Sequence, residues 1–148
     1  YHSMRFRDQW ERLTGYPALI ESAVEEWLRY DGSSGALARV VAADVEFGGR
    51  LLRKGQRVFA FTNSANRDNA QFPDPDRFDI ARTPNAHLAF GHGIHFCLGA
   101  PLARLEGQIA VRRLAERFPG IRRASESEPV WNDSLILRGL KGLHVKLA

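Results

Sequence analysis

The sequence has one cysteine, one methionine and no long apolar run. A single cysteine excludes an internal disulfide and is typical of a reducing compartment. Because no stretch of about 18 apolar residues occurs, we expect no transmembrane helix, and no secretory signal peptide is visible. These features together predict a cytoplasmic protein that does not bind membranes.

A large excess of positive or negative residues is also missing. The chain has 21 Lys and Arg against 17 Asp and Glu, which gives a formal net charge of +4. Its basic residues occur in short groups, such as Arg112-Arg113, and not in a long tract. We therefore expect no nucleic-acid partner, while an acidic protein partner stays open. The length of 148 residues and the hydrophobic fraction of 44% predict one domain with a core.

The only cysteine lies in the glycine-rich stretch FGHGIHFCLG, residues 90–99. Glycines on both sides of Cys97 allow tight turns, and Pro101 stands where a helix would have its first residue. Free N–H groups and the helix dipole favour negative charge at such a place, so they stabilise a thiolate. A stabilised thiolate is a nucleophile or a metal ligand.

Three other interpretations of Cys97 follow from residue type. A lone cysteine is most often a small buried hydrophobe, although the neighbouring glycines argue against that here. A zinc site formed by His92, His95 and Cys97 would lack a second cysteine and the usual ligand spacing. A catalytic Cys–His pair would lack a nearby orienting partner and oxyanion hole.

The periodicity of apolar residues predicts helices together with small antiparallel sheets, which is an α+β fold. We expect helices at residues 8–13, 17–30 and 100–118, and strands at 37–45, 56–61, 130–137 and 143–147. The segment 63–88 has no periodicity but carries large apolar residues, so we expect an ordered, packed meander. The last helix is expected to bury an apolar face formed by Leu102, Leu105, Ile109 and Leu114.

The stretch at 90–99 resembles the haem-binding signature of the cytochromes P450, in the form of the bacterial soluble members. The resemblance implies that Cys97, as thiolate, is the axial ligand of haem b, where it favours O–O bond cleavage. It also implies that the N–H groups of Leu98 and Gly99 hydrogen-bond the sulfur. The matching positions are Phe90, Gly91, Gly93, His95, Cys97 and Gly99.

The resemblance also implies further contacts with haem. Arg39 and His95 match the family's propionate partners, and Phe90 and Gly91 would lie beside the cofactor. From residue type alone, Arg39 would be a solvated arginine at a strand end and His95 a loop histidine bonded to backbone. By the same analogy, the substrate side of the haem is formed by Ala36, Leu37, Ile136 and Leu137.

Glu26 and Arg29 are three residues apart on a predicted helix, so they share a face. Taken alone they are an ordinary surface pair worth a few tenths of a kcal/mol. In the P450 family, a Glu-x-x-Arg pair on a buried helix binds an arginine from a meander. The resemblance therefore implies a structural triad of Glu26, Arg29 and Arg77.

The order of elements resembles only the C-terminal part of the P450 family, and the resemblance implies the family's mainly helical α+β fold. We expect residues 1–148 to be the haem-binding portion, without the oxygen-activating helix that precedes it in the family. The resemblance implies part of a haem-thiolate monooxygenase, which inserts one oxygen atom from O₂ into a small organic substrate. Its electrons would come from NAD(P)H through a ferredoxin-type donor, docked near Arg104, Arg112 and Arg113. The alternative is a truncated, non-catalytic fragment that binds haem weakly or not at all.

Overall fold

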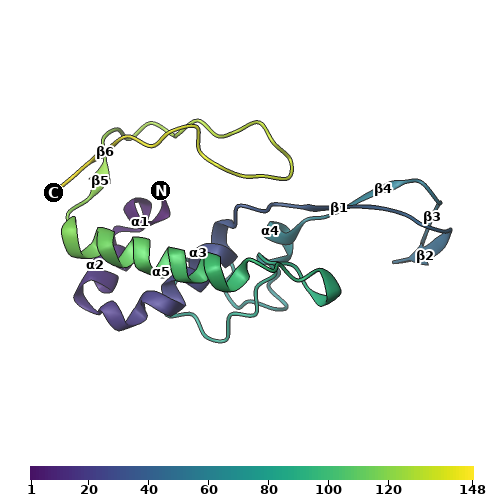
Figure 1. The fold of residues 1–148 in the computed structure, drawn as a ribbon, viewed down its shortest axis with the longest axis horizontal. Helices are drawn as coiled ribbons and strands as arrows, with labels where there is room; N and C mark the ends of the chain where they lie inside the picture. Colours follow the sequence, from purple (N-terminus) through teal and green to yellow (C-terminus); the bar gives the residue numbers. More distant parts are fainter.

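The computed structural model describes residues 1–148 and shows a helical body from which a long arm extends (Figure 1). The body holds the helices, the arm carries the strands β1 to β4, and the C-terminal segment runs along the body. The elements are α1 (His2–Arg5), α2 (Arg7–Gly15), η1 (Pro17–Leu19), α3 (Ile20–Asp31), β1 (Leu37–Val40), β2 (Val45–Phe47), β3 (Arg50–Leu52), β4 (Arg57–Ala60), α4 (Thr62–Ala65), η2 (Gly93–His95), α5 (Ala100–Arg117), β5 (Arg122–Arg123) and β6 (Val145–Lys146).

The predicted helices are confirmed. The 3₁₀ turn η1 begins at Pro17 and leads directly into α3, while α5 has Pro101 in its first turn. A Cβ added to Gly107 of α5 would lie 3.3 Å from Cγ1 of Val24 on α3. The missing side chain at Gly107 therefore allows the two helices to pack closely. None of the helices is both long and apolar enough to cross a bilayer.

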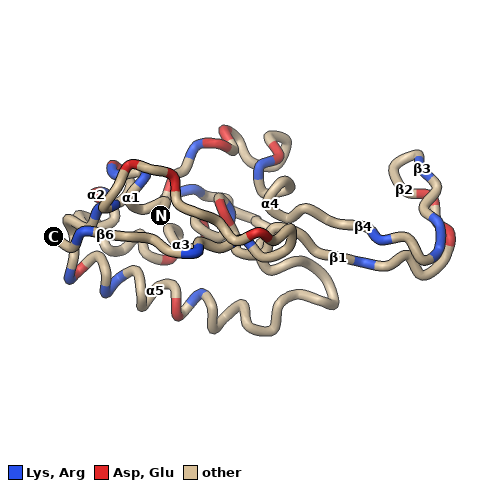
Figure 2. Tube along the Cα trace, turned by 90° about the horizontal axis from the view of Figure 1, so that it is seen from above, with Lys and Arg blue, Asp and Glu red and all other residues tan.

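The arm consists of two separate antiparallel pairs, β1 with β4 and β2 with β3. Gly48 and Gly49 have φ angles of +57° and +73°, which allow the tight turn between β2 and β3. Lys and Arg occur together with Asp and Glu on the body and at the tip of the arm (Figure 2).

The strand predicted at 130–137 is wrong. The two-stranded pair near the C-terminus joins β6 to β5, which follows α5 and was not predicted. Residues 130–137 take part only in isolated bridges, Trp131 with Leu140 and Ser34 with Leu137. Asn132, Asp133 and Ser134 interrupt the run of apolar residues there, and such residues favour turns over strands.

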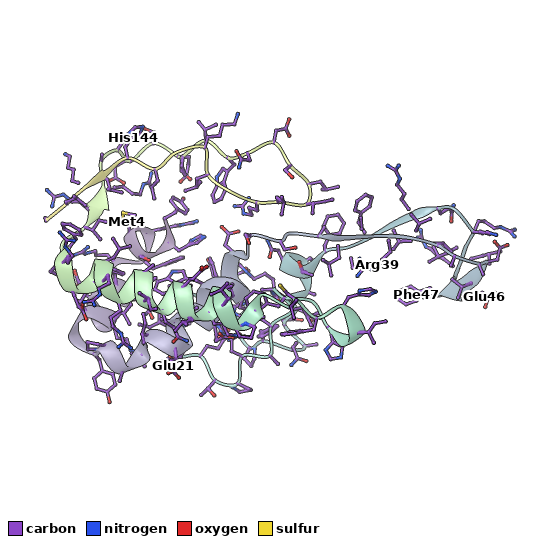
Figure 3. The ribbon with its side chains drawn as sticks, in the orientation of Figure 1. Met4, Glu21, Arg39, Glu46, Phe47 and His144 are labelled. Atoms are coloured by element: carbon purple, nitrogen blue, oxygen red, sulfur yellow. The ribbon has the colours of Figure 1, made fainter.

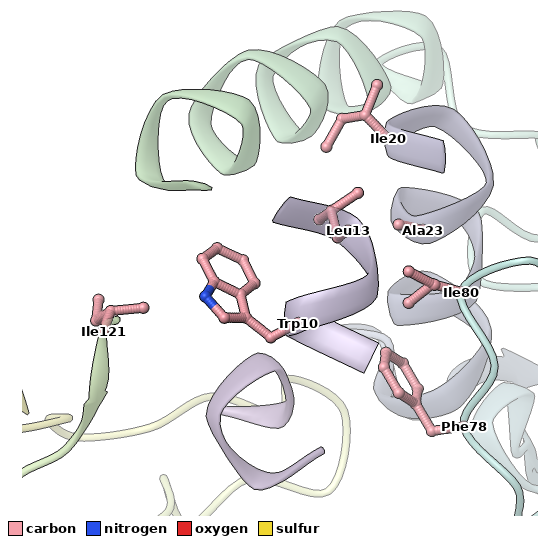
Figure 4. Packing of buried hydrophobic residues seen from close by; sticks show 7 residues of the cluster. All are labelled: Trp10, Leu13, Ile20, Ala23, Phe78, Ile80 and Ile121. Carbon is pink, nitrogen blue, oxygen red and sulfur yellow. The ribbon is translucent and has the colours of Figure 1, made fainter. Parts of the chain in front are cut away.

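The hydrophobic core lies where α2 and α3 meet the meander and the segment after α5 (Figure 4). Phe78 and Ile80 come from the meander, which confirms that this irregular segment is packed. The indole Nε1 of Trp10 donates to the carbonyl of Pro119 at 2.9 Å, so this buried polar atom is satisfied. The full cluster is Trp10, Leu13, Ile20, Ala23, Phe78, Ile80 and Ile121.

The expected buried face of α5 is wrong. Gly107 packs against Val24 of α3, and the larger apolar side chains of α5 are left exposed to solvent: Ile109 is 54% exposed. The face of α5 that contains Gly107 packs on α3, because the absence of a side chain there allows close approach to Val24. The exposed apolar positions are Leu102, Leu105, Ile109 and Leu114.

We expect the same truncation, isoleucine to alanine, to cost much more stability in the core than on the exposed face of α5. Ile80→Ala removes a side chain that is 1% exposed, so it should lower the free energy of unfolding by about 2–5 kcal/mol. Ile109→Ala removes one that is half exposed and should cost below about 1 kcal/mol. Urea unfolding of both variants checks this, and equal losses would contradict the assigned core.

Candidate functional site

The loop at residues 90–99 presents the thiol of Cys97 at the surface, immediately before α5. Gly91 and Gly93 both have φ of +75°, which other residues rarely adopt. The N–H of Cys97 donates to the carbonyl of Phe90 at 3.0 Å, and the N–H of Ala100 donates to the carbonyl of Cys97 at 3.2 Å. Because the thiol is exposed, the interpretation as a buried hydrophobe is wrong.

Cys97 opens into a cavity of about 340 Å³ between the loop, β1 and the end of α3. The cavity has an apolar wall that includes Leu28, Leu37 and Phe90. Arg39 and His95 lie on the same cavity and supply N–H donors. A thiol for the iron, an apolar wall for the porphyrin and donors for two propionates together fit a haem.

The two predicted propionate partners keep unused donors. Nη1 of Arg39 donates to the carbonyl of Ala38 at 2.8 Å, and the guanidinium has no carboxylate partner. Its side chain lies on the side of β1 that faces the cysteine loop (Figure 3). The side chain of His95 is exposed and makes no hydrogen bond. Both residues can therefore bind an anion without breaking an existing ion pair.

Two expectations about the loop differ from the structure. Neither the N–H of Leu98 nor that of Gly99 donates to Cys97 Sγ, although a Cβ added to Gly99 would lie only 3.8 Å from that sulfur. No group of three His, Cys, Asp or Glu side chains is placed to hold a metal ion. The zinc site considered for His92, His95 and Cys97 is therefore wrong.

The carboxylate of Glu26 is the centre of a buried polar cluster, with an exposed fraction of 0%. Arg29 donates to it twice, from Nε at 2.7 Å and from Nη2 at 2.9 Å. The backbone N–H of Asp79 and the side-chain amide of Asn85 donate at 2.9 and 3.1 Å. This confirms that Glu26 and Arg29 form a buried pair and not a surface pair.

The expected third member of the triad, Arg77, is wrong. Its side chain is 65% exposed and lies 3.6 Å from Asp79, and only its backbone carbonyl accepts from Arg29. Arg82 takes the expected place, with Nε 3.3 Å from Glu26 and a side chain 10% exposed. Arg82 also donates to the carbonyls of Pro73, Asp74 and Arg77. The meander carries both arginines, and only its path decides which one reaches Glu26.

The segments predicted on the substrate side do meet. The N–H of Gly35 donates to the carbonyl of Ile136 at 2.8 Å, and Ser34 pairs with Leu137. Leu37 lines the cavity of Cys97, whereas Ile136 lines a second cavity beyond Arg39. Ala36 has an exposed fraction of 0%, so its expected contact with a substrate is wrong.

A second polar cluster was not predicted. Glu25 of α3 accepts from Arg104 Nε at 2.7 Å, from Arg104 Nη2 at 2.9 Å and from His87 Nε2 at 3.0 Å. Arg104 is therefore occupied inside the fold, and of the arginines predicted to attract an electron donor only Arg112 and Arg113 stay outward. Nothing in the sequence indicated that the adjacent Glu25 and Glu26 bind different partners. Their different partners follow from the different directions in which successive side chains leave a helix.

Burial and charge shift the pKa values in this second cluster. Removal from water lowers the pKa of His87 below its usual 6.5, although Glu25 opposes that shift. The pKa of Glu25 is lowered too: burial alone would raise it, but the hydrogen bonds and charges of Arg104 and His87 outweigh burial.

These shifts predict a loss of stability in acid. Below pH 6.5 the unfolded chain protonates His87 while the folded chain resists, so the unfolded state binds more protons and stability falls with pH. Glu25 adds a second loss as the pH falls from 4.5 through its lowered folded pKa. His87→Gln should remove the first loss, and the exposed His144→Gln should not. Urea unfolding between pH 8 and 5 checks this, and parallel profiles for all three proteins would contradict it.

The two arginines of the meander give a direct test of the Glu26 cluster. Arg82→Met should lower the free energy of unfolding by about 3 kcal/mol or more, because it removes a partner of a buried carboxylate together with the hydrogen bonds of Arg82 to three carbonyls of the meander. Arg77→Met should stay within about 0.5 kcal/mol of the parent chain. Denaturant unfolding compares them, and a larger loss for Arg77→Met would restore the triad expected from the sequence.

Comparison with known proteins identifies the fold and the loop. The sequence profile of the family described as Cytochrome P450 matches residues 7–142. Nocardicin C N-oxygenase of Nocardia uniformis is 52% identical over 134 residues, covering 88% of this chain and 34% of that protein. 6-Deoxyerythronolide B hydroxylase of Saccharopolyspora erythraea is 44% identical over 141 residues, covering 95% and 35%.

Comparison with a solved structure gives the same family as the comparison of sequences. The cytochrome P450 PksS of the bacillaene polyketide synthase of Bacillus subtilis 168 superposes with a TM-score of 0.96 at 42% identity, over 99% of this chain and 38% of that one. This confirms the predicted α+β fold. The chain spans about a third of the length of these curated relatives. Members of the family bind haem b and act as monooxygenases, and this chain belongs to the cytochrome P450 family.

Proposed function

We propose that residues 1–148 are the C-terminal haem-binding portion of a haem-thiolate monooxygenase, with Cys97 as the axial ligand of haem b. The observation that carries this proposal is the exposed thiol of Cys97 on a cavity shared with Arg39 and His95, neither of which has a carboxylate partner. Family membership supports it, because the loop at 90–99 retains the family's haem-binding signature.

Each residue of the cavity has a separate task in this proposal. Cys97 supplies the sulfur ligand, and Arg39 and His95 bind the propionates by charge-assisted hydrogen bonds. Leu37 and Phe90 pack against the porphyrin, and Gly91 keeps the backbone close to it. The bound haem would supply the activation of O₂, to which the thiolate contributes electron density. Glu26, Arg29 and Arg82 have a structural role behind the loop.

The exposed apolar face of α5 supports a larger parent domain. Leu102, Leu105 and Ile109 form a patch that a water-exposed helix would not need. We propose that the remaining two thirds of a P450-length chain covers this face and supplies the distal side of the haem. The alternative function is a non-catalytic fragment that binds haem weakly or not at all.

The partners belong to the same proposal. Relatives bear the names N-oxygenase and hydroxylase, which supports insertion of one oxygen atom from O₂ into a small organic substrate. Leu37, Ile136 and Leu137 would contribute to the substrate side. NAD(P)H would supply electrons through a ferredoxin-type donor attracted by Arg112 and Arg113, and a cytoplasmic location keeps Cys97 reduced.

Titration with haem tests the ligand directly. The chain should bind haem and, after reduction with CO, give the red-shifted absorbance of a thiolate complex. Cys97→Ser should abolish that band, because an alcohol is protonated and a poor ligand at neutral pH. A band that persists unchanged in Cys97→Ser would show that Cys97 is not the ligand. No binding by the parent chain would favour the non-catalytic alternative.

A further inference from the structure

The cluster of Glu25, His87 and Arg104 joins three parts of the chain close to the cysteine loop. Glu25 lies on α3, His87 in the meander and Arg104 in the second turn of α5. Glu25 accepts from both Nε and Nη2 of Arg104, so the guanidinium is held in one plane. An isolated surface pair would not fix the side chain in this way.

His87 strengthens the cluster from the buried side, since its side chain is only 2% exposed. Its Nδ1 accepts the backbone N–H of Ala89 at 3.2 Å, and a backbone N–H can only donate. The ring proton therefore lies on Nε2, where it is donated to Glu25. Neutral His87 and the charged Arg104 thus hold the carboxylate from two directions.

The fixed guanidinium of Arg104 contacts Phe90, a residue of the cysteine loop. The central carbon of Arg104 lies 4.8 Å from the centre of the Phe90 ring, a distance suited to a cation–π contact. The carbonyl of Phe90 accepts the N–H of Cys97 at 3.0 Å, and both residues line the same cavity. A shift of the Phe90 ring would therefore change the backbone that presents the thiol.

We propose that Arg104, held by Glu25 and His87, is a positioning residue that fixes Phe90 and through it the presentation of Cys97. This inference rests on the proposed function, because it assigns Cys97 the task of binding haem. The guanidinium touches neither the sulfur nor the cavity, so its effect must pass through Phe90. Outer partners that orient a metal ligand typically contribute 10–100-fold to affinity.

Arg104→Met tests the proposal, with Arg117→Met as a matched control. Arg117 lies on the same helix and also stacks over a phenylalanine, Phe118, at 5.4 Å, but it has no carboxylate partner and lies far along α5 from Cys97. Arg104→Met should weaken haem binding by about 10–100-fold in a Soret titration. Arg117→Met should bind as the parent chain does.

Hydrogen exchange without haem separates positioning from general stability. Exchange at the Cys97 amide should speed up in Arg104→Met, while amides in the middle of α3 keep their parental rates. Equal acceleration at both places would overturn the proposal, because it would mean a loss of stability throughout. Failure of the parent chain to bind haem would refute the proposed function. The exchange rate of the Cys97 amide would still test whether Arg104 positions the loop.

Glu25→Gln keeps the proposal open to refutation if Arg104→Met does not fold, and a Phe90→Leu background tests the route through Phe90 if it does. Glu25→Gln keeps the volume of the side chain and removes its charge, so it should also weaken haem binding and expose the Cys97 amide. Unchanged values in Glu25→Gln would overturn the proposal. In a Phe90→Leu background, Arg104→Met should add no further loss of affinity; additive losses would mean that Arg104 does not act through Phe90.

Discussion

The rest of this structure depends on the buried carboxylate of Glu26. An unpaired charge in a dry interior is strongly destabilising, so Glu26 requires donors on every side. Arg29 supplies two of them from the same helix, and Arg82, Asn85 and the N–H of Asp79 supply the others from the meander. A segment without regular secondary structure is thereby fixed against α3, and the cysteine loop that follows it receives a defined position.

Glu25 and Glu26 are neighbours in the sequence and bind different partners around α3. Glu26 binds Asp79, Arg82 and Asn85 of the meander, whereas Glu25 binds His87 at the end of the meander and Arg104, and so connects α3 to α5. The loop of Cys97 lies between these two attachments. It needs no bonds to its own sulfur to stay in place, because its ends are fixed by Phe90 and by the first turn of α5.

The exposed surfaces complement this rigid centre. The arm of β1 to β4 and the outer face of α5 carry apolar side chains, such as Phe47 and Ile109, that are more than half exposed. The core, in contrast, lies among α2, α3 and the meander. Such a division between a packed centre and exposed apolar faces supports the proposal that the chain is part of a larger domain.

The sequence by itself determined the helices, the cysteine loop and the family, because periodicity and the spacing of residues 90–99 are local properties. The pairing of Glu26 with Arg29 was also readable from their spacing. Only the tertiary structure decided that Arg82 and not Arg77 completes the cluster, and that Ala36 is enclosed. It also decided which face of α5 packs. These outcomes depend on the path of the meander and the close approach of helices, which no local spacing encodes.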